Sequence, residues 1–298
     1  LKCSEGKEAV LRLARLSDVF IQSARPGAMQ RLGLDFETIA KVQPNIVYVS
    51  ISGYGQSGPS RALPMTDTVA QAFSGLMSIN KGRDGVPHKI DTTIVDNVTG
   101  LYAFQATIMA LWGRGPDTPA AHLDISLMQG AASLQAHRVL EYSATRRMPE
   151  ALNPPAGSFP TKDGWIAVTL VTEEQYQRIC ATIGMQQLAT NPRFLTFADR
   201  RVHIAELTGL LDSRFREQTT AEWEARLKAA DILSSPVNDY GAWLDAPQVV
   251  ATVAAPAMVV TGPGAEAGAQ VHVPRTPGQP LFEAAAPQLG QHSRQLLA

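Results

Sequence analysis

Asp96 is the first candidate for a reactive carboxylate in this 298-residue chain. It follows the short apolar run Ile94-Val95 and lies where a helix is expected to begin. One interpretation is a helix N-cap, because aspartate accepts hydrogen bonds from the free amides of a first turn. The other is a nucleophile, because the helix dipole stabilises an ionised carboxylate and ligands bind at the carboxyl ends of strands in α/β sheets. The residues alone leave both interpretations open.

The composition excludes several classes of function. A formal charge of −1 argues against an electrostatic nucleic-acid binder, which needs a concentrated basic face. No apolar run approaches the roughly 18 residues of a membrane span. Cys3 and Cys180 lie far apart, without a CxxC pair or a histidine at metal-ligand spacing. We therefore expect no metal site and no disulfide, and a reducing, cytoplasmic location.

The elements around Asp96 alternate between helix and strand. Apolar periodicity predicts helices at 5–16, 35–41, 97–112 and 126–143, and β-branched or apolar runs predict strands at 18–21, 45–51 and 123–125. This order predicts a parallel sheet with helical crossovers.

A change of composition at Asn153-Pro154-Pro155 suggests a domain boundary. Beyond it we expect a strand at 165–170 and helices at 173–183, 201–215 and 220–229, the last opened by a capping box between Thr219 and Glu222. The predicted domains are 1–150, a smaller α+β domain at 151–240, and a C-terminal segment at 241–298.

Several short motifs follow one another along almost the whole chain. They are Arg25-Pro26-Gly27, Ser52-Gly53-Tyr54-Gly55, Asp67-x-x-x-Gln71-Ala72-x-Ser74-Gly75, Asp96-x-x-x-Gly100, Thr161-Lys162-Asp163-Gly164-Trp165, and Leu289-Gly290-x-His292. Each is weak alone, but in this order they resemble the class III coenzyme A transferases, the CaiB/BaiF family.

The resemblance implies a fold and an assembly. The expected fold is α/β: a large, Rossmann-like CoA-binding domain with a parallel sheet, a smaller α+β domain, and a chain that returns to the large domain in segment 241–298. Relatives usually carry a further N-terminal strand–helix–strand segment, which we expect to be missing from domain 1–150. An interlocked homodimer is also implied.

By the same resemblance, Asp96 aligns with the catalytic aspartate of the family. The expected reaction moves coenzyme A from an acyl-CoA to a free carboxylic acid through an aspartyl-CoA thioester, which divides one difficult exchange into easier steps. Coenzyme A enters as a substrate, and no metal is required.

The resemblance further implies contacts to coenzyme A. The matched positions are Lys2, Ser23, Ala24, Arg25, Arg31 and Asp67. Lys2 and Arg31 match basic positions near the nucleotide, although both are equally understood as solvated surface charges. Asp67 matches an acidic position beside the active site, or else a helix cap. Tyr54-Gly55-Gln56 is expected to line the acyl pocket.

Two alternatives remain at this stage. A racemase of the same superfamily pairs the aspartate with a histidine directly before the acidic position, and here that residue is Thr66. A threonine hydroxyl does not titrate near neutral pH, so the second base of a proton exchange is missing. A catalytically silent partner subunit is the other alternative, and the intact Asp96 argues against it.

Overall fold

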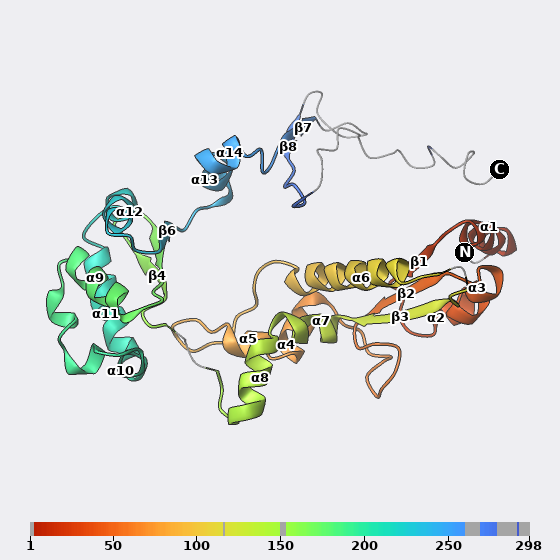
Figure 1. Cartoon of the computed structure of the whole chain (residues 1–298), viewed down its shortest axis with the longest axis horizontal. Coiled ribbons are helices and arrows are strands. Elements are labelled where there is room, and N and C mark those ends of the chain that lie inside the picture. The colour runs from red at the N-terminus through yellow and green to blue at the C-terminus, as the bar shows by residue number, and fades with distance from the viewer. Residues whose placement is uncertain (1–2, 116, 150–152, 260–268, 279–290, 292–298) are drawn as a thin grey trace. The chain divides into compact units, whose positions relative to one another are not determined.

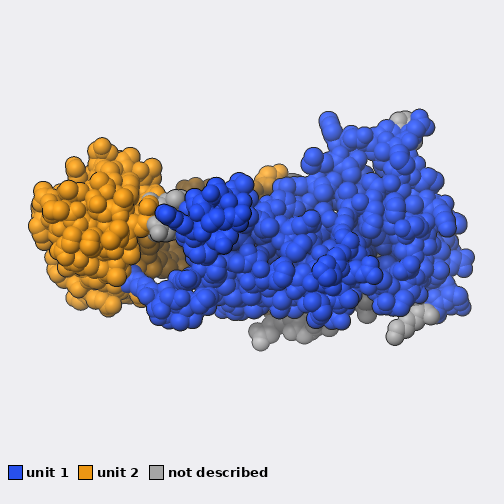
Figure 2. All heavy atoms as spheres, turned by 90° about the horizontal axis from the view of Figure 1, so that it is seen from below, with its two compact units in different colours: residues 1–149, 290–298 blue, residues 150–289 orange. Residues whose placement is uncertain are grey.

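The computed structural model describes residues 3–115, 117–149, 153–259, 269–278 and 291. The chain divides into two compact units, residues 1–149 with 290–298, and residues 150–289 (Figure 2). Of the third expected segment, the described residues 241–259 and 269–278 group with the second unit, and Gln291 groups with the first. The expected return of the chain to the larger domain stays a prediction.

The first unit is built on a parallel sheet. Its strands are β1 (Val19–Gln22), β2 (Val47–Ser52) and β3 (Ala121–Ser126), in the order β1-β2-β3. Both neighbouring pairs are parallel, which confirms the prediction from the alternation of helices and strands. The central strand is buried along almost its full length, as its run of β-branched residues indicated.

The helices of this unit cover both faces of the sheet. They are α1 (Ser4–Arg15), α2 (Ala28–Leu32), α3 (Phe36–Val42), α4 (Asp67–Phe73), α5 (Leu76–Ile79), α6 (Ile94–Trp112), α7 (Leu127–Leu134) and α8 (Ala136–Thr145). In Figure 1, α6 runs beside the three strands.

The side chains of β2 point alternately to the two faces of the sheet, and this alternation determines which helix packs on which face. Val47 and Val49 pack with Ala103 of α6, whereas Tyr48 packs with Ala14 of α1 and Ile39 of α3. Successive side chains of a strand point to opposite faces, so one strand supports two separate apolar clusters. The α6 cluster fixes the helix that carries Asp96.

Three of the predicted helices differ from the structure by more than one residue. Helix α6 begins at Ile94 and not at 97. The expected helix at 126–143 is interrupted at Gln135, and the one at 201–215 at His203. Both interrupting residues have ψ near +25° and lie outside the helical region.

The second unit contains an antiparallel sheet and a set of helices. Its sheet joins β4 (Gly157–Pro160), β5 (Trp165–Val168) and β6 (Ser234–Pro236), and β7 (Ala257–Val259) pairs with β8 (Gln270–His272). Its helices are α9 (Glu173–Thr182), α10 (Phe197–Val202), α11 (Ile204–Phe215), α12 (Thr220–Ala229), α13 (Tyr240–Leu244) and α14 (Pro247–Ala251), with 3-10 turns at Gln186–Leu188 and Pro192–Phe194. The predicted capping box of Thr219 and Glu222 is present at the start of α12.

Arg200 is a fully buried charged residue of this unit. Its guanidinium donates to the carbonyl oxygens of Pro154 (2.7 Å) and Phe194 (2.8 Å) and pairs with the carboxylate of Glu173. It also lies 3.9 Å from the ring centroid of Tyr176. Burial of a charge costs several kcal/mol unless it is paired and hydrogen-bonded, as it is here. The network therefore fixes the segment that leads into the second unit.

Close packing of α6 on α7 supplies a test of the fold. A Cβ added to Gly130 of α7 would lie 2.3 Å from Oγ1 and 3.4 Å from Cα of Thr99 in α6. Gly130→Ala is therefore expected to lower the free energy of unfolding by about 1–3 kcal/mol, as overpacking does. Urea unfolding followed by circular dichroism measures the change.

Gly100 is the matched control, because an added Cβ there meets no neighbouring atom within 4 Å. Gly100→Ala is expected to raise the free energy of unfolding by up to about 1 kcal/mol, since alanine is the better helix former. Equal effects of the two substitutions would contradict the α6–α7 contact described.

Candidate active site

Asp96 is the third residue of α6 and its side chain is exposed. The N-cap residue is Thr93, which makes no side-chain capping bond. The interpretation of Asp96 as the cap is therefore wrong. Within the described part of the chain, the Asp96 carboxylate accepts no hydrogen bond and forms no ion pair. It is a free carboxylate on the first turn of a long helix.

Asp67 supplies the cap that α6 lacks in its own sequence. This residue begins α4 and is only 6% exposed. Its Oδ2 accepts hydrogen bonds from the backbone amides of Val95 (2.7 Å) and Asp96 (3.1 Å). Two of the free amides of the first turn are thereby satisfied by a carboxylate, which the helix dipole also favours. This contact explains why the helix begins at Ile94, three residues before the predicted position.

The electrostatics of Asp96 follow from this arrangement. Although Asp96 as a residue is exposed, protein atoms displace part of the water around its carboxyl group; this raises its pKa, and the negative charge of Asp67 raises that pKa further. From the sequence we expected the opposite direction, since a helix dipole that acts on Asp96 itself would favour the ionised form. Asp67 occupies the amides instead and adds a like charge nearby. A carboxylate with a raised pKa is a stronger base and a better nucleophile in its ionised form.

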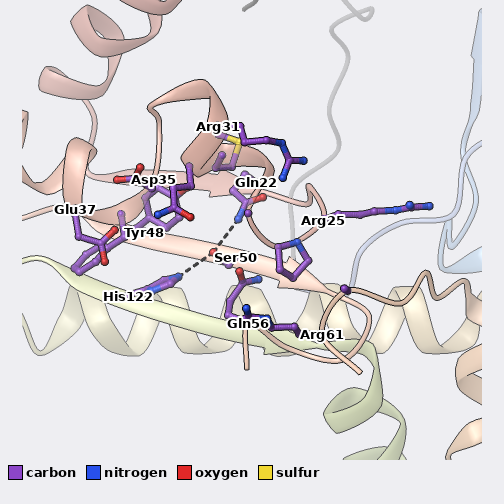
Figure 3. A pocket seen from close by; sticks show the side chains of 16 residues that line it. Gln22, Arg25, Arg31, Asp35, Glu37, Tyr48, Ser50, Gln56, Arg61 and His122 are labelled. Atoms are coloured by element: carbon purple, nitrogen blue, oxygen red, sulfur yellow. Dashed lines mark hydrogen bonds between the residues drawn. The ribbon is translucent and has the colours of Figure 1, made fainter. Parts of the chain in front are cut away.

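A cavity of about 480 Å³ lies in the first unit, over the polar face of the sheet (Figure 3). Arg25 and Arg31 line it, as do Asp35 and Glu37. Arg61, from the loop after β2, lines it as well. Sequence reasoning missed Arg61, because one arginine in a Ser/Gly/Pro-rich loop carries no signal of its own.

A directed chain of hydrogen bonds forms the floor of this cavity. The amide of Ala24 donates to Oε1 of Gln22 (2.7 Å), and Nε2 of Gln22 donates to Oγ of Ser50 (2.8 Å). Oγ of Ser50 lies 2.9 Å from Nε2 of His122, whose ring stacks on Phe36. The single hydroxyl proton of Ser50 can be donated to Nε2, which leaves the proton of neutral His122 on Nδ1. The chain holds the floor in one conformation.

The predicted cofactor residues fall in different places. Arg25 and Arg31 line the cavity, while Ser23 and Ala24 belong to the loop between β1 and that wall. The amide of Ala24 is already used by Gln22. Asp67 lies beside Asp96 and does not line the cavity. Lys2 lies outside the described residues.

The expected acyl-pocket residues also separate. Tyr54 and Gly55 line a second hollow of about 380 Å³ with Phe73, whose ring meets Tyr54 edge-on at 5.1 Å. Gln56 lines the cavity over the sheet instead. Asp124 explains the turn, because its Oδ2 accepts the amide of Gln56 (2.9 Å).

Arg25, Arg31 and Arg61 line the cavity over the sheet together with Asp35 and Glu37. Guanidinium groups can bind phosphate oxygens through two hydrogen bonds at once. Nε2 of Gln56 is buried there without a hydrogen-bond partner among the described residues. The described residues contain no cluster of three potential metal ligands. Among the same residues, none of the helices combines the length and apolar composition of a membrane span.

Comparison with known proteins adds an independent line of evidence. The sequence profile of CoA-transferase family III matches residues 1–293. The acetyl-CoA:oxalate CoA-transferase of Acetobacter aceti is 31% identical over 83% of this chain and 66% of its own length. The succinate–glutarate CoA-transferase of Agrobacterium fabrum is 29% identical over 100% of this chain and 76% of its own.

A solved structure agrees with these similarities. The crystal structure of a CaiB/BaiF family protein from Brucella suis matches with a TM-score of 0.83 and 26% identity. The match covers 100% of this chain and 80% of that one. The chain thus spans about two thirds to four fifths of the length of these three proteins.

The charge of Asp67 generates a prediction about Asp96. Asp67→Asn removes a negative charge close to the Asp96 carboxyl, so ionisation of Asp96 becomes easier and its pKa is expected to fall. Titration of the aspartate carboxyl carbons by NMR measures the shift. Asp84→Asn, in an exposed hairpin turn, is the control and is expected to leave the pKa of Asp96 unchanged. An unchanged or higher pKa in Asp67→Asn would contradict the electrostatic coupling.

Proposed function

The chain belongs to CoA-transferase family III, and on that premise we propose that it transfers coenzyme A from an acyl-CoA to a free carboxylic acid. The observation that carries the proposal is the carboxylate of Asp96. It is exposed, it is bound by no described side chain, and its pKa is raised by burial and by Asp67. These are the properties that a carboxylate nucleophile needs.

In the proposed reaction Asp96 acts twice. Its carboxylate attacks the thioester carbonyl, which forms a mixed anhydride and releases the thiolate of coenzyme A. The thiolate then attacks the aspartyl carbonyl, so an aspartyl thioester forms and the donor acid leaves as a carboxylate. The acceptor carboxylate reverses both steps: it forms its own anhydride with Asp96, and the thiolate takes the acyl group from it. An amide side chain could not serve, because it has no nucleophilic carboxylate.

The cavity over the sheet is the site that we propose for the nucleotide part of coenzyme A. Arg31 and Arg25 supply charge for the phosphates, and Arg61 adds a third guanidinium from another loop. The free donor of Gln56 supports a polar ligand at the same place. Ser23 and Ala24 would then follow the cofactor with their backbone, except that the amide of Ala24 is engaged by Gln22.

The nature of the acids follows only by analogy. The two transferases named above act, by their names, on oxalate, succinate and glutarate, so dicarboxylates are the first acids to test. An interlocked homodimer and a cytoplasmic location belong to the same proposal.

The nucleophile is tested by trapping. After incubation with an acyl-CoA, borohydride or hydroxylamine is expected to modify Asp96, as peptide mass spectrometry detects. Asp96→Asn is expected to abolish exchange of coenzyme A between an acyl-CoA and a free acid. The substitution is expected to change the free energy of unfolding by less than about 0.5 kcal/mol, because the exposed side chain caps nothing.

Heavy water supplies the control for the racemase alternative. Thr66 precedes Asp67 as the N-cap of α4 and offers no titratable group. We expect negligible deuterium at the α-carbon of a 2-methylacyl-CoA, alongside measurable CoA exchange. Rapid deuterium incorporation without exchange, or full activity of Asp96→Asn, would refute the transferase proposal.

Arg31 tests the nucleotide site. Arg31→Ala is expected to weaken binding of coenzyme A more than binding of dephospho-coenzyme A, if its guanidinium meets the extra phosphate. A charge-assisted hydrogen bond of about 1.5–3 kcal/mol predicts a loss of roughly 10-fold to 100-fold, measured by calorimetry. Arg12→Ala on the exposed face of α1 is the matched control and is expected to bind both ligands normally. Unchanged binding of both ligands in Arg31→Ala would show that this side chain is an ordinary surface charge. Equal weakening of both would place its guanidinium at the diphosphate that they share and contradict the contact to the extra phosphate.

A further inference from the structure

Gln71 is a fully buried polar residue in the second turn of α4, four residues after Asp67. Its amide group uses each of its hydrogen-bonding atoms. Oε1 accepts the backbone amide of Ile90 (2.8 Å), and Nε2 donates to Oδ1 of Asp67 (2.5 Å) and to the carbonyl of Ile90 (3.1 Å). The orientation of the amide is therefore fixed by donors and acceptors from two separate segments.

These bonds complete a path to the nucleophile. Oδ1 of Asp67 is held by Gln71, so Oδ2 of the same carboxylate is directed at the amides of Val95 and Asp96. Gln71 also holds the backbone at Ile90 and Thr92, just before α6 begins. One side chain thus connects the start of α4, the approach to α6 and the first turn that carries Asp96.

We propose that Gln71 is a positioning residue for the reaction: it fixes the carboxylate of Asp67 beneath the start of α6 and thereby holds Asp96 in place. The inference rests on the proposed role of Asp96 as the nucleophile. Gln71 itself touches Asp67 and backbone, so its effect on the chemistry passes through Asp67. Misplacement of a reacting group by about 1 Å can cost roughly 100-fold in rate.

Two substitutions distinguish positioning from bulk packing. Gln71→Met keeps the volume but removes every hydrogen bond. Gln71→Glu keeps the acceptor for Ile90, and when its carboxyl group is protonated it donates to Asp67 as the amide did. When this carboxyl group ionises, it has no proton to donate and its negative charge repels that of Asp67. The hydrogen bond between the two side chains is then lost. Gln71→Glu therefore restores the contact in acid and loses it as the pH rises.

The charged groups around Gln71 are few. Asp67 lies on its own helix, Lys89 and Asp91 flank Ile90 in the loop, and Asp96 lies on α6. The other helices of this region, α5 and α7, contain no titratable residue. The pH dependence of Gln71→Glu relative to wild type is therefore expected to report the carboxyl pair.

Gln135 is the matched control. It is also buried (5% exposed), and its Nε2 donates to the carbonyl of Ser74 (2.9 Å) at the other end of α4. Gln135→Met and Gln135→Glu thus remove the same kind of contact without touching Asp67. Any general loss of stability in the unit is expected in both pairs of variants.

Two readouts are measured on the full chain. The first is hydrogen exchange at the amides of Val95 and Asp96, which needs no substrate and no activity. Gln71→Met is expected to speed exchange there by about 10-fold or more, as loss of one buried hydrogen bond allows. The second is kcat for CoA transfer, expected to fall by roughly 10-fold to 100-fold with KM for acyl-CoA nearly unchanged.

The pH profile decides the outcome. The ratio of kcat in Gln71→Glu to kcat in wild type is expected to fall as the pH rises, while the ratio for Gln71→Met stays flat. The Gln135 variants are expected to keep wild-type exchange at Val95 and Asp96. Unchanged exchange at these amides in Gln71→Met, or identical pH profiles for the two Gln71 variants, would overturn the inference. A wild-type chain that forms no adduct at Asp96 would instead refute the proposed function and leave the exchange result standing.

Discussion

The carboxylate of Asp67 on the amides of Val95 and Asp96 is the interaction on which the rest of the site depends. It accepts hydrogen bonds from two free amides at the start of α6, so the helix begins at Ile94, two residues before Asp96. Because Asp67 performs the capping, the carboxylate of Asp96 remains free for chemistry. The same contact brings a like charge close, which contributes to the raised pKa of Asp96. The hydrogen-bonded carboxylate of Asp67 thus contributes to the position of Asp96, to the availability of its carboxylate and to its raised pKa.

The sheet divides two tasks between its faces. Val47 and Val49 of β2 pack against α6, the helix that carries Asp96, while Tyr48 and Ser50 line the cavity. Parallel pairing brings His122 of β3 next to Tyr48 of β2, 74 residues earlier in the chain. The cavity floor therefore combines residues that are far apart in the sequence. Within each strand they share a face because every second side chain points to the same side of the sheet.

Much of the fold followed from local patterns. Apolar periodicity and β-branched runs predicted the three parallel strands and most of the helices, because burial of one face imposes a period on the sequence. The breaks at Gln135 and His203 were missed, since neither residue type forbids a helix and their non-helical ψ angles reflect packing. In the site, Arg25 and Arg31 were predicted to face a ligand, and both line the cavity. Gln56 was expected in the acyl pocket and lines this cavity instead, whereas Arg61 and His122 carry no motif that would have identified them.

The sequence by itself determined the kinds of group available and the family: an aspartate after a short apolar run, arginines in the loops, and motifs in a recognisable order. The strand expected before Asp96 is wrong, because Ile94 and Val95 are the first two residues of α6. Only the tertiary structure decided which groups surround Asp96 and how they change its hydrogen bonds and its pKa. Asp67 and Gln71 lie 29 and 25 residues before Asp96 in the sequence. Asp67 nevertheless accepts a hydrogen bond from the backbone amide of Asp96, and Gln71 donates a hydrogen bond to Asp67. Hydrogen bonds and pKa shifts depend on distances through space and on loss of water, and spacing along the chain records neither. For this reason the sequence left Asp96 as either a cap or a nucleophile, and the folded chain gives the capping contacts to Asp67.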